Sequence, residues 1–134
     1  MTKLIDITSF NAIKEAEQGF DFELKHPDGT PTGAILTVLG SYSTVYQKFI
    51  KKIFNDNQRE IEFAKRKGKE APEKTIEDLQ QQNLESALIR VVGWKNVKQE
   101  FSPELLREIL NNNPHFVAQI IEESDNAANF TKAL

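Results

Sequence analysis

The amino-terminal third of the chain carries two short apolar runs separated by turn residues, a pattern typical of paired β-strands. Apolar and polar side chains alternate in residues 20–24, and residues 34–39 are almost entirely aliphatic or β-branched. Pro27 and Gly29 lie between the runs, at a spacing that favours a type I turn. The pattern therefore predicts a β-hairpin. Because an isolated hairpin is only marginally stable in water, it needs a helical floor, a neighbouring subunit or a third strand, for which residues 1–7 are the candidate.

The rest of the chain shows the apolar spacing of helices, interrupted by capping residues. Helix starts are predicted at Thr8 or Ser9, at Ser41 or Ser43, at Thr75, at Ser102 and at Asn113. The second helix is the longest, and it ends at a mobile linker near residues 67–74, where Gly68 and Pro72 interrupt the pattern. The third helix is predicted to continue through Val92 and to end at Gly93.

Together these elements predict an α+β fold, mainly α, in which an N-terminal β-hairpin packs on a bundle of about four to five helices. The chain has 134 residues, of which 39% are hydrophobic, and this size and composition suit one domain with one core. We therefore expect a single domain over residues 1–134, with a strand-rich part at 1–40 and a helical part at 41–134.

The residue types that catalysis and metal binding require are scarce or scattered. There is no cysteine, which excludes disulfide bonds and thiolate metal sites. His26 and His115 lie in different predicted elements, and neither has a metal-ligand neighbour at helical spacing. Nucleotide-binding glycine motifs and nucleophile motifs are absent, and the carboxylates fall on helix exteriors or in first turns. The sequence therefore predicts no enzyme activity, no metal and no cofactor.

Charge is unevenly distributed along the chain. The net charge is −3, yet residues 48–74 contain nine Lys/Arg against five Asp/Glu. The simplest interpretation is the solvated face of the long helix. The alternative is contact with an acidic partner or a nucleic acid, as in a small nucleic-acid-binding regulatory protein that uses the basic helix 48–69. No apolar run is long enough to span a bilayer, so no membrane partner is expected.

Four hydrophobic residues are candidates for binding a partner protein: Trp94, Phe130, Phe54 and Leu134. Trp94 is the only tryptophan, and it follows a predicted helix end. It is interpreted either as a hinge residue packed where helices meet, with its indole N–H on a carbonyl or water, or as a surface anchor for a partner. The exposed edges of the hairpin also favour self-association.

Two blocks of the chain have a distinctive order of residues. The first is the strand-turn-strand followed by Gly40-Ser41-Tyr42-Ser43-Thr44-Val45-Tyr46. The second comprises Gly93-Trp94, then Phe101-Ser102-Pro103-Glu104, Asn113-Pro114 and Asn126-Ala127-Ala128-Asn129-Phe130. In order and spacing, these blocks resemble the tail assembly chaperones of long-tailed bacteriophages with non-contractile tails. The chain departs from that family at residues 95–100, where an acidic loop is usual, and at residues 114–116, where proline-tryptophan is usual.

The resemblance implies a non-enzymatic role in the host cell cytoplasm. Members of this family coat the long helical tape measure protein and keep it soluble while tail tube subunits polymerise around it, and they are absent from the mature virion. Many are made in two lengths through a ribosomal frameshift, and the longer form recruits the tail tube protein. By this resemblance the chain is the short form of a tape measure chaperone, whereas a structural virion component is a further alternative. We expect the client-binding groove between the long helix and the C-terminal helix pair.

Overall fold

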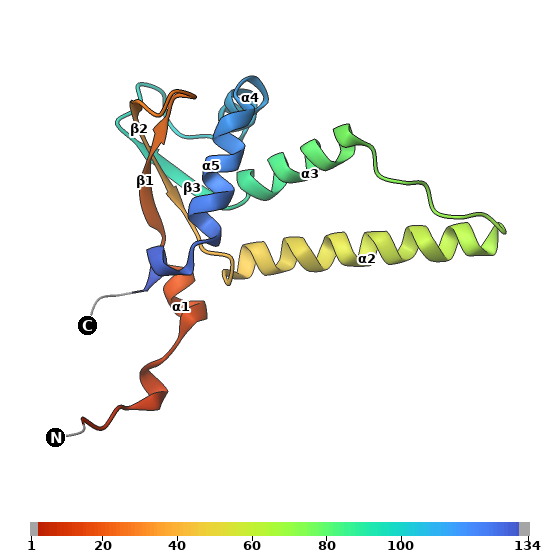
Figure 1. Cartoon of the computed structure of the whole chain (residues 1–134), viewed down its shortest axis with the longest axis horizontal. Coiled ribbons are helices and arrows are strands. Elements are labelled where there is room, and N and C mark those ends of the chain that lie inside the picture. The colour runs from red at the N-terminus through yellow and green to blue at the C-terminus, as the bar shows by residue number, and fades with distance from the viewer. Residues whose placement is uncertain (1–2, 132–134) are drawn as a thin grey trace.

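A three-stranded antiparallel sheet, with helices packed on one of its faces, forms the body of the protein, and one long helix projects from it (Figure 1). The computed structural model describes residues 3–131. In chain order, with η for a 3₁₀ helix, the elements are η1 (Ile7–Ser9), α1 (Ala12–Ala16), β1 (Phe20–Lys25), β2 (Pro31–Val38), α2 (Thr44–Arg66), α3 (Ile76–Leu88), β3 (Val91–Lys95), α4 (Pro103–Asn112), α5 (Pro114–Asp125) and η2 (Ala127–Phe130). The fold is therefore α+β and mainly α, with an N-terminal hairpin, as the sequence predicts.

The hairpin formed by β1 and β2 follows the predicted alternation of apolar and polar residues. Phe22 pairs with Leu36 across the two strands, so their side chains lie on the same face of the sheet. At the turn, Gly29 adopts a φ of 89°, a left-handed conformation that a side chain would disfavour. The positions of both strands thus result from local sequence signals.

The third strand comes from the middle of the chain and not from its start. β3 pairs antiparallel with β2 and places Trp94 beside Leu36. Residues 3–6 form no strand, because Asp6 accepts hydrogen bonds from the backbone and the hydroxyl of Thr8 and so begins the turn η1. The expectation of a third strand from residues 1–7 is therefore wrong for residues 3–7, the part of that segment that the structure describes.

The helix predicted to end at Gly93 is shorter than its apolar pattern indicates. α3 ends at Leu88, and the chain turns directly into β3. Val91 and Val92 are β-branched, and the second edge of β2 pairs with Val91 and Gly93 on either side of an irregularity at Val92, so sheet pairing overrides the helical spacing. Gly93 consequently lies inside a strand and does not end a helix.

Every α-helix except α1 starts at a predicted residue, although the side chains of Ser43 and Asn113 make no capping hydrogen bond. Thr75 begins α3 as part of a reciprocal capping box, and the Ser102 hydroxyl accepts a hydrogen bond from the third backbone amide of α4. α1 is shorter than predicted, since its cap is Asn11 and neither Thr8 nor Ser9. A short polar residue immediately before an apolar run therefore predicts where most of the helices start.

The hydrophobic core lies between the inner face of the sheet and the helices α3, α4 and α5. α5 packs directly against β1 and β2, while α3 contacts both α4 and α5. The buried cluster comprises Leu24, Leu36, Val38, Leu84, Ala87, Leu88, Val91, Leu106, Leu110, Ile120 and Phe130. On the outer face of the sheet, Asp21 accepts hydrogen bonds from Thr37 and Lys95. The sheet thus has one buried face and one solvated face, as antiparallel sheets commonly do.

Arg90 is the largest fully buried side chain of the described residues, with 1% of its surface exposed. Its Nε and Nη2 atoms donate to the backbone oxygen and the hydroxyl of Ser86, over 3.1 and 2.7 Å. Its Nη1 atom donates to the Ser124 hydroxyl over 3.1 Å and to the Asp125 carboxylate over 2.5 Å. The guanidinium carbon lies 3.6 Å from the ring centroid of Tyr46. One buried cation therefore joins α2, α3 and α5.

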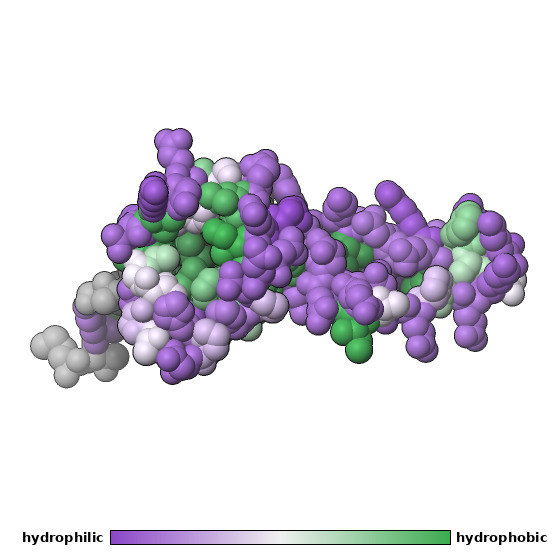
Figure 2. Space-filling view, turned by 90° about the horizontal axis from the view of Figure 1, so that it is seen from above, coloured by the Kyte–Doolittle hydropathy of each residue, from purple (hydrophilic) through white to green (hydrophobic). Residues whose placement is uncertain are grey.

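The long helix α2 contacts the body through its first turns and then projects beyond it (Figure 1). Its apolar residues recur at helical spacing, yet Ile50, Phe54 and Phe63 are exposed and only Ala64 is buried. The chain returns from the far end of α2 to α3 through residues 67–75, which contain no helix or strand, as the predicted linker requires. Figure 2 shows the projecting part as mostly hydrophilic with isolated hydrophobic groups.

Replacing Arg90 with alanine should lower the free energy of unfolding by about 3 kcal/mol, because it leaves buried serine hydroxyls and a carboxylate without their partner. Urea unfolding followed by circular dichroism measures the change. The matched control is Arg59→Ala, since the Arg59 side chain is 81% exposed and its change should stay within about 0.5 kcal/mol. Equal losses in the two variants would contradict a stabilising role for the buried network.

Candidate protein-binding groove

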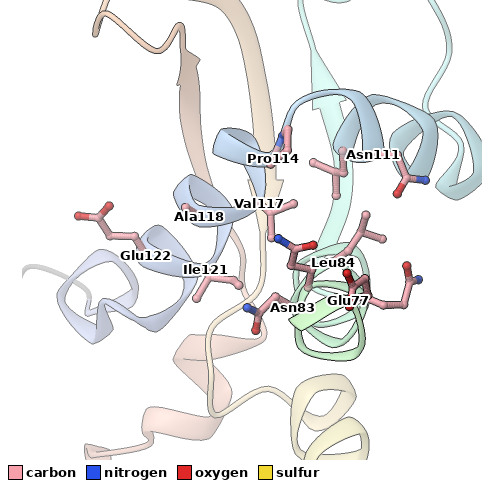
Figure 3. Close-up of a pocket in the computed structure, with 12 residues that line it drawn as sticks. Glu77, Asn83, Leu84, Asn111, Pro114, Val117, Ala118, Ile121 and Glu122 are labelled. Carbon is pink, nitrogen blue, oxygen red and sulfur yellow. The ribbon is translucent and has the colours of Figure 1, made fainter. Parts of the chain in front are cut away.

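A groove of about 730 Å³ opens on the body where α3 meets α4 and α5 (Figure 3). Its apolar surface comes chiefly from Leu84 of α3, Leu110 of α4, and Val117 and Ile121 of α5. Leu84 and Leu110 are buried, and the two α5 residues are half-buried. In Figure 3, Val117 and Ile121 lie on α5 opposite Leu84 on α3. The groove is thus an extension of the core that reaches the surface.

Polar side chains surround this apolar surface. They are amides and carboxylates, namely Glu77, Gln80, Gln81, Asn83, Asn111 and Glu122. Among the described residues that line the groove, none is lysine or arginine. Amides both donate and accept hydrogen bonds, whereas carboxylates only accept them and attract cations. The rim therefore favours a ligand that has unpaired backbone groups or basic residues beside its apolar side chains.

Local sequence signals position the three helices that form the groove. Pro114 begins α5 immediately after Asn113, so α4 and α5 are joined by a single residue and must be neighbours. α3 is braced against α4 by an ion pair in which both Nη atoms of Arg107 donate to the carboxylate of Glu85. This hydrogen bonding, opposed by partial burial, lowers the pKa of the Glu85 carboxyl. The brace fixes the separation of the two walls.

The side chains that line the groove are of types that bind a partner through contact and hydrogen bonds. Within residues 3–131, no group of three or more His, Cys, Asp or Glu side chains is placed to hold a metal ion. The carboxylates of Glu77 and Glu122 are exposed at the rim. What the groove supplies is apolar contact together with hydrogen-bonding amides, the combination that peptide-binding grooves use.

The predicted partner-binding residues do not come together in the structure. Trp94 lies in β3, half-buried, and so is not a hinge between helices. Its indole N–H donates to the backbone oxygen of Gln99 over 2.8 Å, as expected of a satisfied tryptophan, and its ring packs edge-on against Phe101 with centroids 5.1 Å apart. These contacts hold the loop that follows β3.

The three other candidates are distributed between core and surface. Phe130 is only 8% exposed and packs edge-on against Phe20 in β1, so its role is in the core and not in partner contact. Phe54 is 61% exposed on the projecting part of α2. Leu134 lies outside the described residues. None of the candidates lines the groove.

The groove also differs in place from the one expected. The sequence predicts a groove between the long helix and the C-terminal helix pair, but α2 contributes no lining residue, and α3 forms the opposite wall. The physical reason is that α3 carries the apolar residues that pack on α4 and α5. The polar run Gln80–Asn83 marks this wall in the sequence, yet a run of amides alone is equally typical of a solvated helix face.

The basic stretch 48–74 lies mostly on α2 and is solvated. Lys48, Lys51 and Lys52 are exposed on the side of the helix away from its apolar residues. Acidic neighbours partly offset this charge, since Arg59 lies 4.0 Å from Asp56 and other carboxylates follow. The local electrostatics are therefore mixed, with the basic side chains accessible from solvent.

Searches of family models, of curated proteins and of solved structures found no match to this chain. In the part of the chain that the structure describes, no helix is long and apolar enough to cross a membrane.

Replacing Glu85 with glutamine should reduce stability at neutral pH by about 1 kcal/mol or less, because the ion pair is partly exposed. Since the folded pKa of Glu85 is lowered, its contribution is complete above the pKa of an unfolded glutamate, about 4.3, and is lost as the pH falls through the lower folded value. The variant should therefore lose less stability than the wild type as the pH falls from about 5 through the pKa of an unfolded glutamate and below it.

Urea unfolding at a series of pH values measures this difference. The matched control is Glu108→Gln, an exposed glutamate of α4 that has the same change of side chain. An identical pH dependence in the two variants would show that the brace between α3 and α4 does not contribute to stability.

Proposed function

We propose that the protein is a non-enzymatic bacteriophage tail assembly chaperone, which binds the tape measure protein and keeps it soluble during tail morphogenesis. The observation that carries the proposal is the apolar groove between α3 and the α4–α5 pair. A long helical client presents apolar stripes that aggregate in water, and a groove of this kind covers such a stripe by helix-in-groove contact. The resemblance of residues 20–130 to tail assembly chaperones agrees with this use of the groove.

The proposed place of action is the host cell cytoplasm, and the protein is released before the virion matures. Release requires that each contact with the client be weak. Many copies bound along one client still hold it, because each neighbouring site raises the effective concentration of the next. In this proposal the tail tube protein is recruited through a longer form of the chain.

Co-expression with a fragment of a tape measure protein should raise the soluble fraction of that fragment, and the two proteins should co-purify. Ala118→Lys should reverse both effects, because it places a cation among the apolar lining residues, and Ala118 is exposed enough for the fold to tolerate it. We expect binding to weaken roughly tenfold or more, measured by calorimetry with the purified fragment.

The matched control is Asn55→Lys, which adds the same side chain at an exposed position of α2 opposite its apolar stripe. It should bind the fragment as the wild type does. Failure of the wild type to solubilise or co-purify any tape measure fragment would refute the proposed function. Equal binding by the two lysine variants would place the client elsewhere than in the groove.

A second candidate function is that of a small nucleic-acid-binding regulator. The observation that favours it is the exposure of the basic side chains on α2, a helix that projects from the body and is free to lie along a phosphate backbone. The net charge of −3 and the acidic residues within α2 oppose it.

Nucleic-acid binding predicts that short duplex DNA or RNA shifts at low salt, and that the affinity falls steeply as salt is added. Gel shift and fluorescence anisotropy at about 50 and 200 mM salt test this. The double variant Lys51→Gln and Lys52→Gln should reduce the salt dependence. Absence of any shift at low salt would exclude this function.

A further inference from the structure

The first described residues form an apolar N-terminal arm, residues 3–13, that extends from the body. Its five large hydrophobic side chains are between 61% and 92% exposed, and they are Leu4, Ile5, Ile7, Phe10 and Ile13. Single exposed hydrophobic residues are common on protein surfaces and need no explanation. Five within so short a segment form an apolar patch of the kind that marks a contact with a partner.

The N-terminal arm is fixed to the body at its root. Ala16 is buried, and its carbonyl accepts a hydrogen bond from the Gly40 amide over 2.9 Å. A Cβ atom on Gly40 would lie 2.9 Å from the Cβ of Ala16, so the glycine is what allows this close approach. The root of the arm is therefore held in one place, while its apolar tip remains accessible.

The hydrogen bonds at the tip of the arm are local. Among the described residues, the hydrogen bonds of residues 3–10 stay within the arm, and those of Asp6 with Thr8 and Ser9 define the turn η1. The backbone of Lys3, Leu4 and Ile5 forms none with other described residues. The tip of the arm, whose backbone at residues 3–5 is unpaired with other described residues, therefore projects from the body on the end opposite α4 (Figure 1).

The groove has the features that such a segment requires. It offers apolar contact, and three of its rim amides, Gln80, Asn83 and Asn111, make no side-chain hydrogen bond with other described residues. Amides that both donate and accept are suited to pair with the backbone of an extended peptide. The acidic rim residues Glu77 and Glu122 suit Lys3, while the one anion of the arm, Asp6, accepts hydrogen bonds from Thr8 within the arm.

We propose that the N-terminal arm of one copy binds in the groove of a second copy. The arm leaves the body away from the helices that form its own groove, so a neighbouring molecule is the occupant that the geometry favours (Figure 1). A helix such as α2 meets the groove through apolar contact alone, because its backbone groups are already paired, whereas the arm also offers backbone groups to the rim amides. Pairing through the sheet edges is the alternative route to self-association, and it predicts association that survives changes in the arm and in the groove.

The proposal predicts that the mass of the protein in solution exceeds that of a monomer and rises with concentration. The double variant Ile5→Asp and Phe10→Asp should weaken self-association roughly 30-fold or more, the loss typical of central interface residues. The matched control is Ile61→Asp and Phe63→Asp, which makes the same exchange of side chains at two exposed positions of α2. Analytical ultracentrifugation over a range of concentrations measures all three proteins.

A mixing experiment then tests whether the arm and the groove bind each other. The arm variant retains its groove, and Ala118→Lys retains its arm, so each should be monomeric alone while their mixture forms a complex. Circular dichroism checks that both are folded. A wild type that is monomeric at high concentration would overturn the proposal, as would self-association that survives both variants, the result expected for pairing through sheet edges. Two monomeric variants that do not associate when mixed would also overturn it.

Binding of the arm in a second copy is a property beyond the chaperone function, and experiment can refute either one separately. A wild-type protein that self-associates but does not bind the tape measure fragment would refute the chaperone function alone. Solubilisation of the tape measure fragment by a strictly monomeric protein would refute the exchange of arms alone. If both hold, self-association and client binding use the same groove, and added fragment should lower the mass of the wild-type assembly.

Discussion

The burial of one guanidinium group is the constraint on which the rest of the structure depends. Removing a cation from water is costly unless its donors are satisfied, and Arg90 is satisfied by groups from two helices and by the ring of Tyr46 on a third. Ser124, which accepts from Arg90, in turn donates to the carbonyl of Leu39 at the end of β2. Helices and sheet must therefore meet at this one point.

Two consequences follow from that meeting point. The base of α2 is fixed by the contact with Tyr46, so the helix has a defined direction even though its far half leaves the body. Arg90 joins the end of α3 to α5, and the Glu85–Arg107 ion pair joins α3 to α4, so the same three helices that line the groove are connected to one another.

Some of the fold could be predicted from short-range signals, and some of it could not. The alternation in residues 20–24 and the cap at Ser102 gave the correct elements, because their hydrogen bonds form within a few residues. The spacing of Val91 and Val92 fits a helix, and only the pairing of this segment with the second edge of β2 makes it a strand. The place of the groove could not be predicted for a related reason, since an apolar stripe does not indicate which helix will cover it.

The sequence by itself determined the mixed class of the fold, most helix boundaries, the hairpin and the shortage of catalytic and metal-binding residue types, because each depends on residue type and local spacing. The tertiary structure decided that Phe130 is core, that Trp94 belongs to a strand, and that Arg90 is buried. It also decided which apolar residues remain exposed, on the N-terminal arm and on α2. Burial depends on which segments meet in space, and those contacts join residues far apart in the chain.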